Sequence, residues 1–177
     1  VDHVGDCVGR ACPSEDDNLQ SRHLADLKQI TCSSPEYLAQ RGTTQTPNNL
    51  TGHQAVGYFF AHQPAESHLE FVAGGQIEKR QLPAKLTVSG ADAYVAAAQA
   101  GFGRIHVSEL AIAPELAQGE LVEVLHLHLP PPMPLYIMYP PGRFLAPRTR
   151  VLLDWLITLF SPAAKPAHQD TISGKNR

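Results

Sequence analysis

The chain has 177 residues, of which 43% are hydrophobic and 18% charged, and its net charge is −3. This composition is typical of a folded globular protein of one domain or two small lobes, and it excludes an intrinsically disordered chain. The sequence contains no apolar run of about 18 residues that would predict a transmembrane helix, and no concentrated basic segment that would predict DNA binding. The first residues, VDHVGDCVGR, lack the apolar core of a signal peptide.

The first half of the chain predicts short strands that alternate with short helices. Ser34 can cap a helix that starts at Pro35 and stops at Gly42, because serine, proline and glycine favour these three positions. Thr46 followed by Pro47 predicts a second helix start. Strands are predicted at residues 6–12, 24–31 and 55–60.

The second half of the chain continues the alternation. Residues 68–88 predict a β-hairpin with a Gly74-Gly75 turn, and the alanine-rich residues 91–100 predict a helix. Further predictions are strands at 105–107, 121–129 and 135–139, a helix from Ala113 to Gly119, a closing helix at 148–160 with a wide apolar stripe, and a disordered tail from 161. The fold class is therefore α/β with a mixed sheet.

No catalytic or cofactor motif is present. The sequence lacks GxSxG, HExxH, GxGxxG and a Walker loop, which favours a protein that is not an enzyme and binds no cofactor. His126 and His128 would share one face of a strand, yet no third metal ligand accompanies them. The three cysteines are too few for a disulfide framework and favour buried, reduced thiols in a cytoplasmic protein.

Several short motifs follow one another in a characteristic order. S-P-x-Y-L-x-x-x-G runs from Ser34 to Gly42, T-P-x-x-L-x-x-H runs from Thr46 to His53, and A-P-E-L-x-x-G-x-L-V runs from Ala113 to Val122. P-L-Y-x-x-Y-P begins at Pro134, and the closing R-V pair is Arg150 and Val151. In this order the chain resembles the effector-binding domain of LysR-type transcriptional regulators, particularly the CrgA-like group.

The resemblance implies a type 2 periplasmic-binding-protein-like fold, with two α/β lobes joined by two crossover strands. Residues 1–13 would be a remnant of lobe I, 19–132 would form lobe II, and 133–160 would return to lobe I, with 161–177 as the tail. The family's opening strand, helix and strand have no counterpart here, and neither does its helix-turn-helix domain. The resemblance therefore implies an incomplete first lobe and a truncated chain, whose exposed apolar surface predicts marginal stability.

The resemblance also implies an effector in the cleft between the lobes. Arg10 would suit an anionic effector through a bidentate contact, although a structural ion pair is an equal alternative. Ser89 could donate to the effector or cap the following helix, and capping is favoured. Arg104 stands where the family usually has an aliphatic residue. The effector-binding candidates are Arg10, Ala11, Cys12, Val88, Ser89, Gly90 and Phe102.

The partners follow from the same resemblance. They are a small-molecule effector, a second copy or a tetramer in the complete protein, and DNA only through the missing helix-turn-helix domain; no membrane partner is expected. One alternative is a solute-binding protein of a transporter, which shares the fold. Another is a small α/β hydrolase that uses Ser33 or His53.

Overall fold

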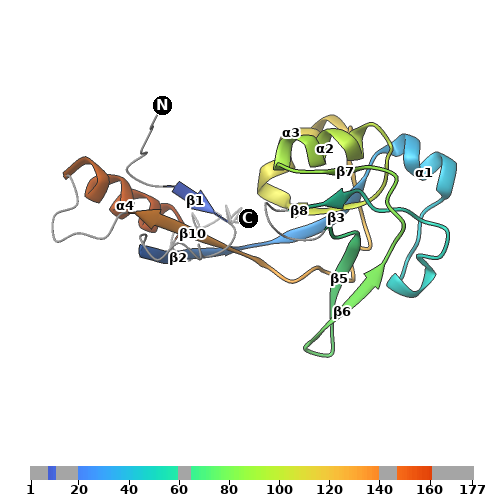
Figure 1. Cartoon of the computed structure of the whole chain (residues 1–177), viewed down its shortest axis with the longest axis horizontal. Coiled ribbons are helices and arrows are strands. Elements are labelled where there is room, and N and C mark those ends of the chain that lie inside the picture. Colours follow the sequence, from blue (N-terminus) through green and yellow to red (C-terminus); the bar gives the residue numbers. More distant parts are fainter. Residues whose placement is uncertain (1–7, 11–19, 60–64, 140–146, 161–177) are drawn as a thin grey trace, which may run out of the picture. The chain divides into compact units, whose positions relative to one another are not determined.

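The computed structural model describes residues 8–10, 20–59, 65–139 and 147–160 (Figure 1). The chain divides into two compact units, one formed by Val1–Ala25 with Pro134–Arg177 and the other by Asp26–Met133. The strands β2 (Gln20–Leu27) and β10 (Met133–Tyr139) each contribute residues to both units. Cys7, Cys12 and the predicted tail lie outside the described residues.

The second unit is built around strand β3 (Gln29–Ser33). It pairs antiparallel with β8 (Ile105–Ser108) on one edge and with β9 (Val122–Val124) on the other. Nearby, β4 (Gly57–Tyr58) pairs parallel with β7 (Thr87–Val88). Parallel and antiparallel pairs both occur among the described residues, but they belong to separate sheets rather than to the single mixed sheet that was predicted.

The helices of this unit begin and end close to the predicted residues. In α1 (Pro35–Arg41), the Ser34 hydroxyl accepts a hydrogen bond from the Tyr37 backbone N–H at 3.3 Å, and Gly42 follows the last turn. The remaining helices are α2 (Ala91–Gln99), α3 (Ala113–Gln118) and the short 3₁₀ turns η1 (Pro47–Asn49) and η2 (Glu109–Ile112). The start predicted at Thr46 gives only η1, where Thr46 makes no capping hydrogen bond.

Two apolar clusters form the core of the second unit. In Figure 1, α2 and α3 lie on one side of β3 and β8, and β5 (His68–Ala73) and β6 (Gln76–Gln81) lie on the other. The first cluster contains Ile30, Cys32, Val56, Ala97, Ala98, Ile105, Ile112 and Leu121. The second contains Leu50, Ala55, Leu69, Phe71, Leu82, Val124 and Leu125. Burial on both sides makes β3 the centre of the unit.

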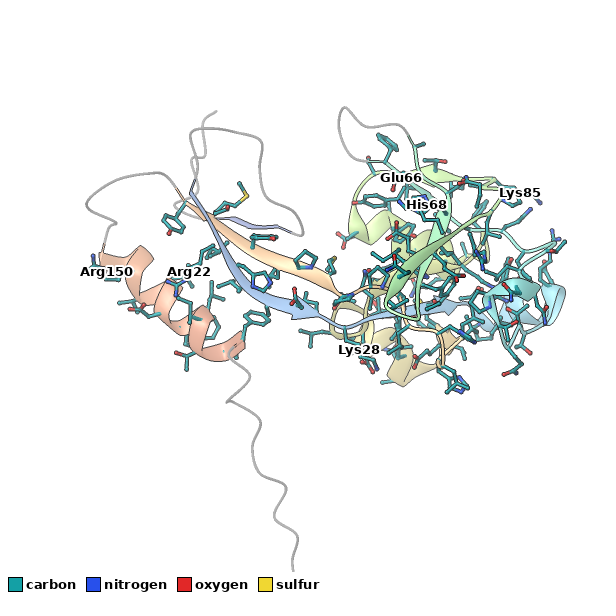
Figure 2. The ribbon with its side chains drawn as sticks, turned by 90° about the horizontal axis from the view of Figure 1, so that it is seen from below. Arg22, Lys28, Glu66, His68, Lys85 and Arg150 are labelled. Atoms are coloured by element: carbon teal, nitrogen blue, oxygen red, sulfur yellow. The ribbon has the colours of Figure 1, made fainter. Side chains whose placement is uncertain are left out.

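Strands β5 and β6 form the predicted hairpin around Gly74 and Gly75, which both have positive φ. Glu70 lies opposite Lys79, and their side chains form a 2.7 Å ion pair. His68 Nε2 is 3.1 Å from Glu70 Oε1 and 3.8 Å from Glu66 Oε2. Figure 2 shows Glu66 beside His68. Burial alone would raise the pKa of Glu70, but hydrogen bonds from Lys79 and His68 outweigh it and hold that pKa below its usual range.

The first unit contains a three-stranded sheet in the order β1-β10-β2, where β1 (Val8–Arg10) runs antiparallel to β10. Helix α4 (Pro147–Phe160) carries the predicted apolar stripe. Val151, Leu152, Trp155 and Leu159 of this stripe are exposed, whereas Leu156 and Phe160 are partly buried. Within the described ranges, no helix is both long and apolar enough to cross a bilayer.

Two strand predictions need correction. The strand predicted at 121–129 ends at Val124, because Leu125 adopts a φ of 58° and its carbonyl accepts a 2.7 Å hydrogen bond from His128 N–H. His126 and His128 therefore lie in a turn and share no strand face. The strand predicted at 24–31 is divided at Lys28 between β2 and β3.

The two-sided burial of β3 predicts a measurable difference between two equivalent substitutions. Ile30 is fully buried, whereas Ile77 on β6 is 56% exposed. Ile30→Val should lower the free energy of unfolding by about 0.5–1.5 kcal/mol through the lost methylene and the cavity it leaves. Ile77→Val should change it by less than about 0.5 kcal/mol. Urea unfolding measures both values, and equal losses would contradict this description of the core.

Candidate functional site

The end of β7 and the start of α2 meet at a turn flanked by two tyrosines. Val88 pairs with Tyr58, and its carbonyl accepts a 3.1 Å hydrogen bond from the Phe59 N–H. The Gly90 N–H donates to the Tyr58 hydroxyl at 3.2 Å. The rings of Tyr58 and Tyr94 meet edge to face, 5.1 Å apart. The predicted residues Val88, Ser89 and Gly90 are therefore held together by β4 and α2.

The first turn of α2 has no side-chain cap. Gly90 occupies the N-cap position with a φ of 93°, which glycine adopts without steric cost, so the prediction that Ser89 caps the helix is wrong. Ser89 itself is exposed. A helix start without a side-chain cap presents backbone N–H donors and the positive end of the helix dipole. This end of α2 can therefore favour a hydrogen-bond acceptor or a negative charge, although Asp92 already places one carboxylate in the first turn.

Tyr58 and Tyr94 were not among the predicted site residues. Burial raises the pKa of Tyr94 to about 12, and a backbone hydrogen bond with His106 only partly offsets it. The phenol therefore stays neutral at physiological pH. No motif singles out either tyrosine. Tyr58 lies near Gly90 because β4 pairs with β7, and Tyr94 lies near it because it is one helical turn further along α2.

Phe102 lies at the opposite end of α2 from Gly90. Its N–H donates to the Ala97 carbonyl at 3.1 Å, next to the C-terminus of the helix, and its side chain is 41% exposed. The nine residues of α2 span roughly 13 Å at 1.5 Å per residue. The structure therefore does not bring Phe102 beside the other candidates of this unit.

The remaining candidates belong to the first unit. Arg10 is the last residue of β1 and lies opposite Tyr136 of β10. Ala11 and Cys12 lie outside the described residues. The predicted effector contacts are thus divided between the two units.

Arg104 lies immediately before β8 and is fully buried. Its Nη1 donates to Thr44 Oγ1 at 2.6 Å, and its Nη2 lies 3.3 Å from His53 Nδ1. Because a guanidinium can only donate, His53 Nδ1 is the acceptor, and a neutral His53 ring carries its proton on Nε2. Burial lowers the pKa of Arg104, and a hydrogen bond with Tyr37 partly offsets this effect.

The sheet face beneath β5 is unusually polar. Thr31 lies opposite His106, and Gln29 lies opposite Ser108. Among the described residues, the buried atoms Thr31 Oγ1, His106 Nε2, Ser108 Oγ and Arg104 Nε have no hydrogen-bond partner. Burial lowers the pKa of His106 to about 4, so the ring is neutral in the folded protein near pH 7.

The residues considered for catalysis have structural contacts. The Ser33 hydroxyl is buried and donates to the Gly103 carbonyl at 3.3 Å, while His53 contacts Arg104 and Tyr37. Burial raises the pKa of Cys32 to about 12, which keeps it a protonated, unreactive thiol. Within the described ranges, no three His, Cys, Asp or Glu residues gather to hold a metal ion.

Comparison with known proteins identifies the family. Residues 4–161 match the LysR substrate binding domain. The chain belongs to this family. Such LysR regulatory domains bind small-molecule effectors and are not enzymes, so neither Ser33 nor His53 is assigned a catalytic role.

The relatives agree with this assignment. The chain is 33% identical over 153 residues to the HTH-type transcriptional regulator YhjC of Escherichia coli, covering 85% of this chain and 50% of that protein. It is 26% identical to the solved CrgA regulatory domain of Neisseria meningitidis, with a TM-score of 0.69, covering 88% of this chain and 75% of that chain. The AphB activator of Vibrio cholerae, at 20% identity and a TM-score of 0.67, shares the fold. The chain spans about half the length of the curated relatives it matches.

The buried, neutral His106 predicts that stability falls in mild acid. In the unfolded chain a histidine takes up a proton below about pH 6.5, whereas folded His106 does so only near pH 4. The unfolded state therefore binds more protons between these values, and stability falls as the pH falls through this window. The shift corresponds to about 3 kcal/mol at most.

Urea unfolding at several pH values between 7.5 and 4 measures this loss. The His106→Asn variant should lose less stability on acidification than the original chain. His126→Asn, the same substitution in the exposed turn, is the matched control. An unchanged pH dependence in His106→Asn would contradict the role assigned to this ring.

Proposed function

We propose that this chain is the effector-sensing part of a DNA-binding transcriptional regulator. The match of residues 4–161 to the LysR substrate binding domain carries the proposal. The relatives are named HTH-type regulators, and this chain spans about half of each. With a net charge of −3 and no concentrated basic segment, DNA contact would be the task of a helix-turn-helix domain outside the given sequence.

The proposal extends to the two-lobed form of the fold. Residues 1–13 and 133–160 would belong to lobe I, residues 19–132 would form lobe II, and β2 and β10 would be the two crossover strands. Two observations support this assignment. The chain forms two compact units, and β2 and β10 each contribute residues to both of them. The chain covers 75% of the solved CrgA regulatory domain, so part of that domain lies outside the match.

We propose Val88, Ser89 and Gly90 as effector-contacting residues of the second unit, whereas Arg10, Ala11 and Cys12 stay separate predictions for the first unit. The uncapped start of α2 supports this site, because its backbone donors suit an acceptor group on the ligand. These donors also suit a negatively charged group, so the proposed effector is a small anion. Phe102 stays a separate prediction, because α2 separates it from this turn.

The complete protein would act in the cytoplasm as a homodimer or tetramer. Its relatives are named transcriptional regulators, and regulators of DNA work where the DNA is. No observation here favours the alternative of a transporter's solute-binding protein. The effector would change the arrangement of the lobes and so report its presence to the DNA-binding domain.

Titration of the 177-residue chain with small carboxylates tests the effector site. Acetate, succinate and benzoate would each be compared with the matching amide, and backbone amide signals would be followed by NMR. At least one carboxylate should shift the signals of Val88, Ser89, Gly90 and the first turn of α2 more than its amide does. Absence of any carboxylate-dependent shift at this turn would contradict an anionic effector here.

A matched pair of arginine variants tests the role of Arg10. Arg10→Gln should weaken binding of that carboxylate by about tenfold or more, because it removes a charge-assisted contact. Arg22→Gln removes the same charge from an exposed position on β2, labelled in Figure 2, and should have little effect. Equal weakening by both variants would indicate general electrostatics rather than a contact from Arg10.

A further inference from the structure

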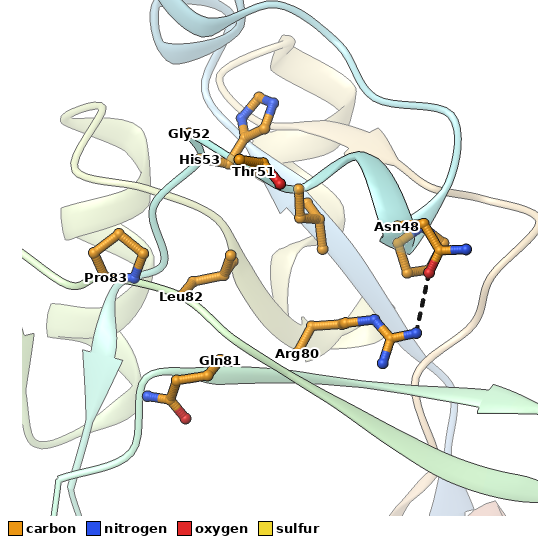
Figure 3. Close-up of a pocket in the computed structure, with 10 residues that line it drawn as sticks. Asn48, Thr51, Gly52, His53, Arg80, Gln81, Leu82 and Pro83 are labelled. Carbon is orange, nitrogen blue, oxygen red and sulfur yellow. Dashed lines mark hydrogen bonds between the residues drawn. The ribbon is translucent and has the colours of Figure 1, made fainter.

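A pocket of about 260 Å³ lies within the Asp26–Met133 unit, between the η1 segment and the end of β6 (Figure 3). Two prolines, Pro47 and Pro83, are part of its lining. Leu50 and Leu82, which are 3% and 6% exposed, also line it and belong to the second core cluster. The pocket thus combines an apolar surface with rigid walls.

One guanidinium stands in this pocket. Figure 3 shows Arg80 directed toward Asn48, and its Nη2 donates to Asn48 Oδ1 at 3.1 Å and to Glu78 Oε2 at 2.6 Å. Its Nη1 also donates to the Lys79 carbonyl at 3.5 Å, and a guanidinium has five N–H donors, more than these three contacts use. Arg80 is therefore held in place and can still donate to a further acceptor.

The surroundings of the pocket are positively charged. His53, another lining residue, has its pKa lowered first by burial and then by the charges of Arg104 and Arg41. Arg41 also donates to the carbonyl of Gly52 in the pocket wall, at 3.2 Å. The guanidinium groups near the pocket are therefore those of Arg41, Arg80 and Arg104. Glu78 is the carboxylate that contacts Arg80.

This pocket lies at the other end of β4 from the proposed effector contacts. The Pro83 carbonyl accepts a 3.1 Å hydrogen bond from the Ala55 N–H, ahead of β4. From there β4 and β7 run in parallel toward Tyr58 and Val88. A ligand in this pocket would therefore not compete for the turn at Val88 to Gly90.

We propose that this pocket is a second ligand site, which binds a small monocarboxylate with an apolar body. The carboxylate would accept hydrogen bonds from Arg80, and the apolar part would lie on Leu50 and Leu82 between the two prolines. The volume is near the lower limit of about 300 Å³ for ligand pockets, which fits a single aromatic ring rather than a nucleotide. The site goes beyond the proposed effector function and does not depend on it, because every lining residue belongs to one unit.

Benzoate and benzamide, used as probes on the 177-residue chain, test this proposal by NMR titration. The two molecules have nearly the same shape, but only benzoate carries the negative charge. Benzoate should shift the backbone amides of Thr51, Gly52, Gln81 and Leu82, and benzamide should bind there about tenfold more weakly or worse. Shifts confined to Val88–Gly90, no shifts at the pocket with millimolar benzoate, or equal binding of benzamide would overturn the proposal.

Two variants identify the charged contact. Arg80→Gln should weaken benzoate binding by about tenfold, because the charge-assisted hydrogen bonds are lost. Lys85→Gln removes an equal charge from an exposed position and should change the affinity by less than about threefold, as expected for a screened surface charge. Unchanged binding in Arg80→Gln would overturn the site, and the benzamide comparison decides the question if that variant does not fold.

Discussion

The described structure depends on one constraint, the burial of strand β3 on both faces while both its edges are paired. Its backbone hydrogen bonds go to β8 and β9, so neither edge is open to solvent. Ile30 and Cys32 pack with α2 and α3, and Thr31 and Ser33 face the opposite side. Because an apolar layer on one face and a polar row on the other are fixed by the same five residues, a shift of one position would exchange the two environments.

The buried polar side chains on this face of the sheet lower the stability of the fold, and other interactions in the unit must offset that loss. Thr31, His106 and Ser108 are removed from water with side-chain atoms that have no partner among the described residues. Arg104 adds a buried positive charge held by Thr44, His53 and Tyr37, none of which is an acid. A buried charge without an acidic partner among the described residues is destabilising, so the hydrogen bonds around Arg104 and the edge-to-face packing of Phe71 on His106 must compensate.

The same framework separates two chemically different ends of the second unit. At one end, β4 and β7 deliver Val88 and Gly90 to the uncapped start of α2, where backbone donors and the helix dipole dominate. At the other end, the segments before β4 and β7 carry prolines, buried leucines and the guanidinium of Arg80. One end therefore offers backbone hydrogen bonds and the other offers a charged side chain above an apolar surface. The two proposed sites differ because one follows β4 and β7 along the chain and the other is formed by segments that precede them.

The sequence by itself determined the family, the α/β class and the local elements whose signals are short-range. Ser34, Pro35 and Gly42 define α1, and Gly74 with Gly75 defines the hairpin turn, because capping and turn geometry depend on neighbouring residues. Tertiary contacts decided the rest. They ended β9 before His126, made Gly90 the cap in place of Ser89, and moved Phe102 to the far end of α2. They also placed Tyr58 beside Gly90 and Arg80 beside Asn48, because strand pairing joins residues that no local pattern connects.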